Sequence, residues 1–379
     1  MEISRRAAML ASVSAASLGV AGRALAEDTI KIGQLTPLTG ASAEAGRFEV
    51  NGAKLALETV NAQGGALGRR VELVIEDNQS SNPGAVLAFS RLASRGDLVG
   101  YFPGTNSTQT HALAPDALKA GRPVMILATD PKLTHMGHPW LFRCRPNDSY
   151  SARVIADFGV KELKKQKWVI VHSTDAFGVA GMRTLIEALG AFGIKPVLVQ
   201  GYTNQQPDFT PLAIAVKQAD ADVMASYTTF DTDVALLARQ IHDLGVRLPW
   251  IGSPTIASTS AIKLGGRSLS GTYGVVDFAV ASNPEGRAFA DRYEQVYGTR
   301  ADFYSATLFD GVTILARAIN EAKSTDPDKM RQAILAIRGF KGAEGEYNFD
   351  ANGDGLHGYN IVRNDNGAIV FDRHIEFIE

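Results

Sequence analysis

Hydroxyl and amide side chains gather in GTNSTQT, residues 104–110, directly after the apolar run LVGYFP. A loop that leaves a parallel strand and opens a helix presents unpaired N–H groups and the positive end of the helix dipole. Thr105, Asn106 and Ser107 are placed to complete an anion pocket there. The alternative is helix capping alone, because a Ser or Thr before HALAP would satisfy those N–H groups without a ligand.

A second polar loop of the same kind follows the next apolar run, PVMIL, and reads Ala128-Thr129-Asp130-Pro131. Neighbouring strands of a parallel sheet bring their carboxyl ends to one edge of the sheet. Both loops can therefore face one ligand carboxylate, and the two together favour a binding site over capping alone.

Sequence motifs for catalysis are not found. There is no G-x-S-x-G, H-E-x-x-H or Walker A motif, and no G-x-G-x-x-G after the first predicted strand. We therefore expect no enzyme and no cofactor.

Two patterns resemble metal sites. His135 and His138 form a loop-like HMGH that lacks a third ligand, so we interpret it as solvated loop. Residues 350–355, DANGDG, begin like a calcium loop, but position 12 would be Ile361 instead of a carboxylate, which favours a glycine-rich turn. We expect no metal.

Composition indicates a globular protein large enough for two domains. The chain has 379 residues, of which 45% are hydrophobic and 21% charged. The formal net charge of −2 and the lack of a basic tract argue against a nucleic-acid partner.

The elements that must position the polar loops alternate between strand-like and helix-period runs. A strand over 29–35, a helix over 46–61 and three further strands form one unit, and the pattern restarts near Asp148. Helices near 284–297, 304–321 and 327–337 and two short terminal strands complete the chain. This order predicts an α/β protein with two doubly wound parallel-sheet lobes and a cleft between them.

The first 26 residues have the features of a signal peptide. A basic start, MEISRR, precedes a short apolar run and Ala24-Leu25-Ala26, which has the small-x-small form of a cleavage site. We expect cleavage after Ala26 and export to the periplasm, through the general secretory or the twin-arginine route. Cys144 is the one cysteine, so neither an internal disulfide nor a lipid anchor in the leader is expected.

The chain resembles the leucine/isoleucine/valine-binding protein family, the type I periplasmic solute receptors of ABC transporters. The resemblance rests on the order and spacing of many weak pieces, among them IKIGQLTPLTG, ATDPKLT, PWLFRCRPND, DAFG and GEYNFDANGDG. It implies two lobes joined by a three-crossing hinge, with residues 28–147 plus 277–356 in lobe I and 148–276 plus 357–379 in lobe II. It also implies permease and ATPase partners and a monomeric receptor.

Site residues follow from the same resemblance. The family's carboxylate-binding positions match Thr105 to Ser107 and Thr129, and the carbonyl that binds the ligand ammonium matches Ala128. Aromatic residues that cover the ligand match Phe177 and Phe230, and Tyr227 adds apolar surface nearby.

At one position important for binding, the sequence differs from the family pattern. Ser253-Pro254-Thr255 stands where family members that bind amino acids usually have an acidic residue, and Ala45 replaces an aromatic found in some relatives. Asp130, Asp175 or Asp231 are candidates to replace the missing counter-charge. Two ligand classes therefore stay open, hydrophobic amino acids and aromatic or branched aliphatic acids without an amine, as does a sensor role without transport.

Overall fold

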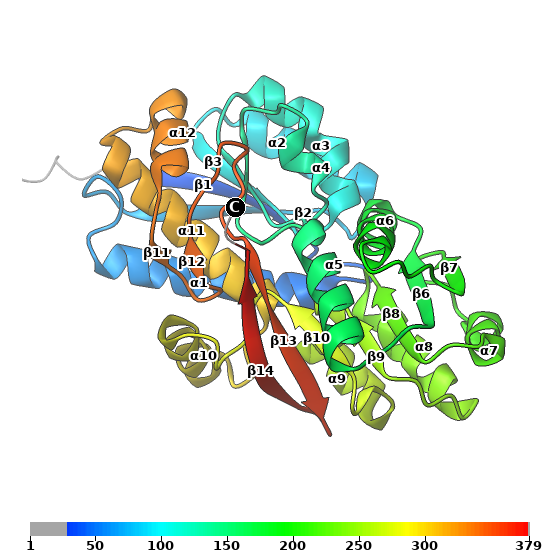
Figure 1. Cartoon of the computed structure of the whole chain (residues 1–379). Helices are drawn as coiled ribbons and strands as arrows, with labels where there is room; N and C mark the ends of the chain where they lie inside the picture. The colour runs from blue at the N-terminus through cyan, green and yellow to red at the C-terminus, as the bar shows by residue number, and fades with distance from the viewer. Residues whose placement is uncertain (1–28, 378–379) are drawn as a thin grey trace, which may run out of the picture.

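The computed structural model describes residues 29–377 and has two α/β lobes (Figure 1). One lobe is drawn mainly in blue and cyan and the other mainly in green. Within residues 29–377, no helix combines the length and apolarity needed to cross a bilayer. The signal-peptide prediction lies outside the described residues.

The first lobe is built on a five-stranded parallel sheet in the order β2-β1-β3-β4-β5. Its strands are β1 Ile30–Thr36, β2 Val71–Asp77, β3 Leu98–Pro103, β4 Val124–Ile126 and β5 Leu141–Arg143. The helices that follow them are α1 Ala43–Ala62, α2 Asn82–Ser94, α3 Ser107–Ala120 and α4 Lys132–His135. Residues from later in the chain complete this lobe with α10 Pro284–Tyr297, α11 Phe303–Ala322, α12 Pro327–Ala336, β11 Phe340–Lys341 and β12 Glu346–Tyr347.

Alternation along β3 fills the two faces of this sheet. Phe102 packs with residues of α1 and α11, whereas Tyr101 packs on the opposite face with residues of α2 and α3. Successive side chains of a strand point to opposite faces, so this run of six buried residues contributes to two cores.

The second lobe is built on a seven-stranded sheet in the order β14-β13-β10-β9-β8-β6-β7. The parallel strands are β6 Trp168–Ser173, β7 Leu198–Tyr202, β8 Val223–Tyr227, β9 Trp250–Gly252 and β10 Tyr273–Val276, to which the antiparallel hairpin β13 Gly358–Asp365 and β14 Ala368–Glu376 is added. The helices are α5 Asp148–Asp157, η1 Phe158–Glu162, α6 Ala176–Gly190, α7 Thr210–Gln218, α8 Asp231–Asp243, η2 Pro254–Ala257, α9 Thr259–Gly265 and η3 Gly266–Leu269.

The predicted fold class, including the three crossings, is confirmed. The chain passes from β5 to α5, returns after β10 to the first lobe, and passes again to β13. Buried polar contacts tie the crossings together. Arg145 on the first crossing forms an ion pair with Asp277 on the second, and Asn360 at the end of the third donates to the Asp277 carbonyl at 2.7 Å.

The sequence missed several short elements. β5 has three residues, which is too short for a periodic pattern, and η1 continues α5 as a π-helical turn. The terminal strands are longer than expected, with eight and nine residues, and form a hairpin on the edge of the second sheet. Residues 350–355 form the predicted turn, in which Asp350 accepts from the backbone of Asn352 and Asp354.

A glycine in α1 permits close packing of α1 on α11. A Cβ at Gly52 would lie 2.0 Å from the Ser305 carbonyl oxygen. We predict that Gly52→Ala lowers the free energy of unfolding by about 1–3 kcal/mol through overpacking, measured by urea denaturation. In the matched control Gly190→Ala, at the exposed end of α6, an added Cβ meets nothing within 4 Å, and we expect a gain of about 0.5–1 kcal/mol. Equal effects of the two variants would contradict the packing argument.

Candidate functional site

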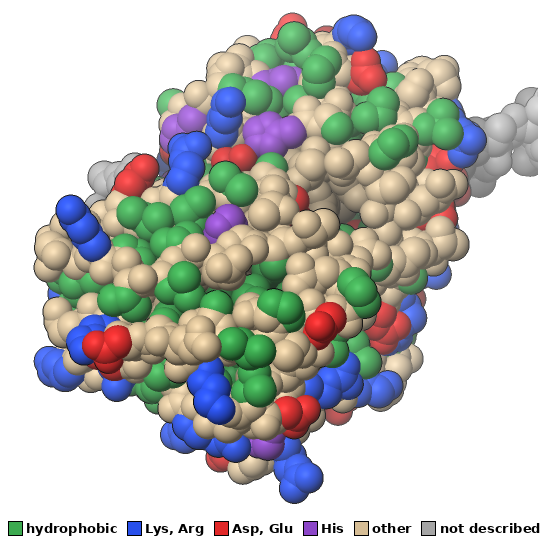
Figure 2. Space-filling model, turned by 90° about the vertical axis from the view of Figure 1, so that its right-hand side faces the viewer, with side chains coloured by type: hydrophobic (Ala, Val, Ile, Leu, Met, Phe, Trp, Pro, Cys, Tyr) green, Lys and Arg blue, Asp and Glu red, His purple; other side chains and the backbone are tan. Residues whose placement is uncertain are grey.

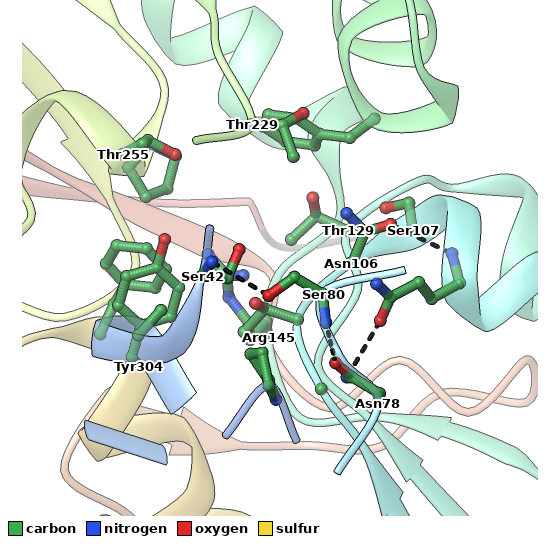
Figure 3. A pocket seen from close by; sticks show the side chains of 18 residues that line it. Ser42, Asn78, Ser80, Asn106, Ser107, Thr129, Arg145, Thr229, Thr255 and Tyr304 are labelled. Atoms are coloured by element: carbon green, nitrogen blue, oxygen red, sulfur yellow. Dashed lines mark hydrogen bonds between the residues drawn. The ribbon is translucent and has the colours of Figure 1, made fainter. Parts of the chain in front are cut away.

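A cavity lies between the lobes, beyond the carboxyl ends of both parallel sheets (Figure 3). It offers about 50 Å³ of space to water-sized molecules. In Figure 3, Thr229 and Thr255 of the second lobe face the first-lobe residues across a gap. The lining residues are Pro37, Ser42, Ala45, Asn78, Ser80, Gly104, Thr105, Asn106, Ser107, Gln109, Thr129, Arg145, Phe177, Thr229, Pro254, Thr255, Phe303 and Tyr304.

Direct contacts close the lobes around this cavity. The Ala176 N–H of the second lobe donates to Thr108 Oγ1 at 3.0 Å. The Tyr304 hydroxyl donates to Asp231 Oδ1 at 3.4 Å, and the Thr259 N–H donates to Asp302 Oδ2 at 3.3 Å. These are the contacts that hinge opening must break.

The start of α3 forms one wall, as the GTNSTQT stretch predicts. The helix is capped, but by Asn106 and not by a Ser or Thr as the capping alternative supposed, since Asn106 Oδ1 accepts from the Gln109 N–H at 3.0 Å. Ser107 Oγ accepts from the Asp130 N–H at 3.3 Å. Since an accepting hydroxyl keeps its own proton, Ser107 can still donate to a ligand, and capping and ligand binding are compatible here.

The two predicted threonines also line the cavity, but their donors are engaged with buried carboxyls. The Thr129 hydroxyl donates to Asp148 Oδ2 at 2.7 Å. The Thr105 N–H donates to Glu49 Oε1 at 3.2 Å, and the Thr36 hydroxyl donates to the other oxygen of Glu49. Burial raises the pKa of Glu49 to about 7 and that of Asp148 to about 6. A direct bond from Thr129 to a ligand carboxylate stays a prediction.

Phe177 and Pro254 of the second lobe line the cavity. Three other predicted site residues do not line it: Tyr227, Phe230 and Ala128. Tyr227 lies behind Phe177, edge to face with ring centroids 5.8 Å apart, and its hydroxyl bonds Ser151 Oγ at 2.8 Å. Phe230 is buried as the N-cap residue of α8, and Thr229 lines the cavity in its place. The Ala128 carbonyl accepts from Arg143 Nη1 at 2.5 Å.

Arg145 is the one charged side chain among the cavity-lining residues, and no pattern in the sequence indicated it. It is 4% exposed. Its Nε donates to Asp277, its Nη1 donates to the Leu127 carbonyl at 3.1 Å, and the guanidinium lies 4.7 Å from the Phe303 ring centroid. Burial alone would lower the pKa of Arg145, but the charge of Asp277 and the bond to it hold the pKa above its ordinary value.

Acidic residues surround the cavity without lining it. Burial raises the pKa of Asp231 to about 6 and, with the nearby charge of Asp231, the pKa of Asp302 to about 8. The proposed substitutes for the missing acid are all bonded to protein groups. Asp130 pairs with His111 at 2.7 Å, Asp175 accepts from Thr229 at 2.6 Å and from other donors, and Asp231 accepts from Ser258 at 2.8 Å.

Metal ligation has no support in residues 29–377, where no cluster of three or more His, Cys, Asp or Glu side chains is arranged for it. His138 Nε2 is bonded to the Ala114 carbonyl at 3.0 Å, and His135 Nε2 lies 3.4 Å from Asp354. The two histidines of HMGH therefore face different partners.

Three cavity-lining residues were not predicted from the sequence, although they also lie in loops that follow parallel strands. Asn78 and Ser80 follow β2, and Thr229 follows β8, each at the carboxyl end of a parallel strand. Ser80 Oγ accepts from the Ser42 N–H at 3.1 Å, and Asn78 Nδ2 donates to Gln109 Oε1 at 3.1 Å (Figure 3). Applying the strand-end rule to every strand would have found these three.

Two doubly wound lobes with a closed cavity between them are the architecture of type I periplasmic binding proteins. Residues 29–368 match the family described as periplasmic binding protein, and the chain belongs to that family. It is 28% identical over 367 residues to the Leu/Ile/Val-binding protein homolog 3 of Brucella melitensis, covering 96% of this chain and 98% of that protein.

Solved structures agree on the fold. The leucine-binding protein LivK of Thermotoga maritima has a TM-score of 0.85 at 25% identity, with 92% of this chain and 99% of that chain covered. A solute-binding protein of an ABC transporter from Rhodopseudomonas palustris, in complex with 3,4-dihydroxybenzoic acid, has a TM-score of 0.85 at 19% identity, with 93% and 99% covered.

The bond from Thr129 to Asp148 predicts a pH-dependent effect on stability. Thr129→Val leaves the buried carboxyl one donor short, which costs about 1–3 kcal/mol of unfolding free energy when Asp148 is ionised. Because the pKa of Asp148 is about 6 and loss of the bond raises it further, the cost is largest at pH 8, shrinks as pH falls toward 6 and is mostly gone below 6.

Urea denaturation of the unliganded protein at pH 5 and pH 8 measures this difference. Thr203→Val, at an exposed position, serves as the control and should change stability little at either pH. A Thr129→Val effect that is absent, or equal at both pH values, would show that the hydroxyl does not stabilise the Asp148 carboxylate.

Proposed function

We propose that this chain is the solute receptor of an ABC transporter and closes its two lobes on a small organic carboxylate. The single observation that carries the proposal is the closed cavity between the lobes, lined by the start of α3 and one buried cation. A helix N-terminus and an arginine both favour a bound anion. In this proposal Thr105, Asn106, Ser107 and Thr129 surround the carboxylate, and Phe177 and Pro254 cover the rest of the ligand.

The division into lobes is part of the proposal. Residues 28–147 plus 277–356 would move against 148–276 plus 357–379, since the three crossings lie at these boundaries. The strands of each sheet fall on one side of this division, which supports it. Residues 1–26 would be a signal peptide that delivers the receptor to the periplasm, where a permease with its ATPase receives the ligand from a monomeric receptor.

A branched-chain or other hydrophobic amino acid is the second candidate ligand. It is favoured by the names of the Brucella relative and of the Thermotoga structure, a Leu/Ile/Val-binding protein homolog and a leucine-binding protein. The Rhodopseudomonas protein was solved with 3,4-dihydroxybenzoic acid, a carboxylate without an amine. The same fold therefore serves both ligand classes, and the lining residues decide between them.

Catalysis is not part of the proposal. No turnover of bound ligand is expected, because the cavity lining offers no nucleophile paired with a base and no metal cluster within residues 29–377. A sensor without a transporter would use the same closure.

Ligand-induced closure is the direct prediction of the proposed function. The protein is unfolded and refolded to remove solutes, and thermal shift then identifies the carboxylates that stabilise it. We expect small-angle scattering to show a smaller radius of gyration with the most stabilising carboxylate than without it. An unchanged radius at saturation, or no stabilisation by any carboxylate, would contradict the proposal. Non-acidic analogues of the same size, such as benzamide for benzoate, are the control.

Processing after Ala26 is a separate prediction. Intact-mass measurement of protein from the periplasm should give a mature chain that begins at Glu27. A periplasmic product that retains residues 1–26 would show that the segment is not a cleaved leader.

A further inference from the structure

The guanidinium of Arg145 is only partly used by the protein. Nε donates to Asp277 and Nη1 donates to the Leu127 carbonyl, whereas Nη2 has no hydrogen-bond partner within residues 29–377. An arginine carries five N–H donors, and buried donors in folded proteins are normally satisfied. A cation that is 4% exposed and lines the cavity therefore has donors left for an acceptor that the protein does not supply.

The position of Arg145 is fixed from several sides. The ion pair with Asp277 holds one edge of the guanidinium, and the Phe303 ring lies 4.7 Å from its central carbon. The planar fork is therefore oriented before a ligand arrives, which limits the entropy lost on binding. Such a group acts on a ligand more strongly than a flexible lysine on the surface would.

The residues that line the cavity make a positively charged group on the ligand unfavourable. None of the lining residues is acidic, and the acids nearest to the wall are bonded to protein donors behind it, Glu49 to Thr105 and Asp231 to Tyr304. A ligand ammonium in this cavity would lie near the cation Arg145. The lining contains no carboxylate that could pair with the ammonium. An unpaired buried charge is strongly unfavourable.

We propose that Arg145 is a ligand-binding and specificity-determining residue, whose Nη2 binds the ligand carboxylate and selects organic acids that lack an ammonium group. The inference rests on the proposed receptor function and names its ligand class. In this arrangement the carboxylate lies between Arg145 and the start of α3, where Ser107 retains a hydroxyl proton. The apolar part of the acid then faces the aromatic side chains of Phe177 and Tyr304, which line the same cavity.

Matched pairs of ligands test the selection without any mutation. Titration calorimetry on refolded protein compares leucine with 2-oxoisocaproate and phenylalanine with phenylpyruvate, and adds benzoate and 4-hydroxybenzoate. The acid of a pair should bind at least about tenfold more tightly than its amino acid, since the ammonium lacks a counter-charge. An amino acid that binds as tightly as its oxo acid would overturn the inference and leave the proposed function intact.

Substitution of Arg145 tests the residue itself. Arg145→Gln should weaken binding of the acids about 10- to 100-fold, the loss of one charge-assisted bond, and should reduce the preference for acid over amino acid. Arg183→Gln, the same change at an exposed position of α6 and outside the cavity lining, should leave affinity unchanged. Folded Arg145→Gln with wild-type affinity for the acids would overturn the inference.

A second variant keeps the test decisive if Arg145→Gln fails to fold. Arg145→Lys keeps a cation beside Asp277 but lacks the planar fork with its second terminal nitrogen, so binding of the acids should weaken. Wild-type affinity of this variant for the acids would contradict the inference. Failure of the proposed function is a different result, because then none of these carboxylates, with or without an amine, would bind or close the lobes.

Discussion

The buried ion pair between Arg145 and Asp277 is the interaction on which the hinge and the cavity both depend. Isolated, either charge would be too costly to bury, so the first and second crossings must meet where these residues lie. The third crossing joins them through Asn360, which donates to the Asp277 carbonyl, and through Asp354, which pairs with Arg143 at 2.8 Å. One network of polar contacts thus connects all three crossings, and Arg145 of this network lines the cavity.

Closure of the lobes places further carboxyls in a dry environment. Asp231 of α8 and Asp302 at the start of α11 come from different lobes, and the bonds to Tyr304 and Thr259 connect them across the interface. The pKa of both is raised, chiefly by burial. A proton on such a carboxyl relieves the cost of burial. Figure 2 shows that charged side chains on the outer surface are instead interspersed in both signs on the face drawn.

Much of the architecture could be predicted from the sequence because it depends on local signals. β3 and β6 are mainly apolar runs, and the bounds expected for α10, α11 and α12 lie within one residue of the observed ones. GTNSTQT was informative because a polar loop after a buried strand lies at the sheet edge where ligands bind. Strands of three residues such as β5 carry no such signal.

The chemistry of the site could be predicted only in part. Thr105, Asn106, Ser107 and Thr129 were found by position, but the sequence could not show that Glu49 and Asp148 occupy donors of Thr105 and Thr129. Arg145 was missed because its role depends on where β5 ends and on a partner 132 residues away. Long-range pairing of buried charges leaves no local pattern, and it is this pairing that decides which ligand charge the cavity accepts.

A competition experiment tests whether the cleft selects a small carboxylate without an amine. Refolded protein is incubated with an equimolar mixture of hydrophobic amino acids and their 2-oxo and deaminated analogues, together with aromatic acids, and is then separated from free solute. Mass spectrometry of the solute released on denaturation should find an amine-free acid at close to one molecule per chain. Retention of leucine or another amino acid from this mixture would contradict the proposed selection of amine-free acids.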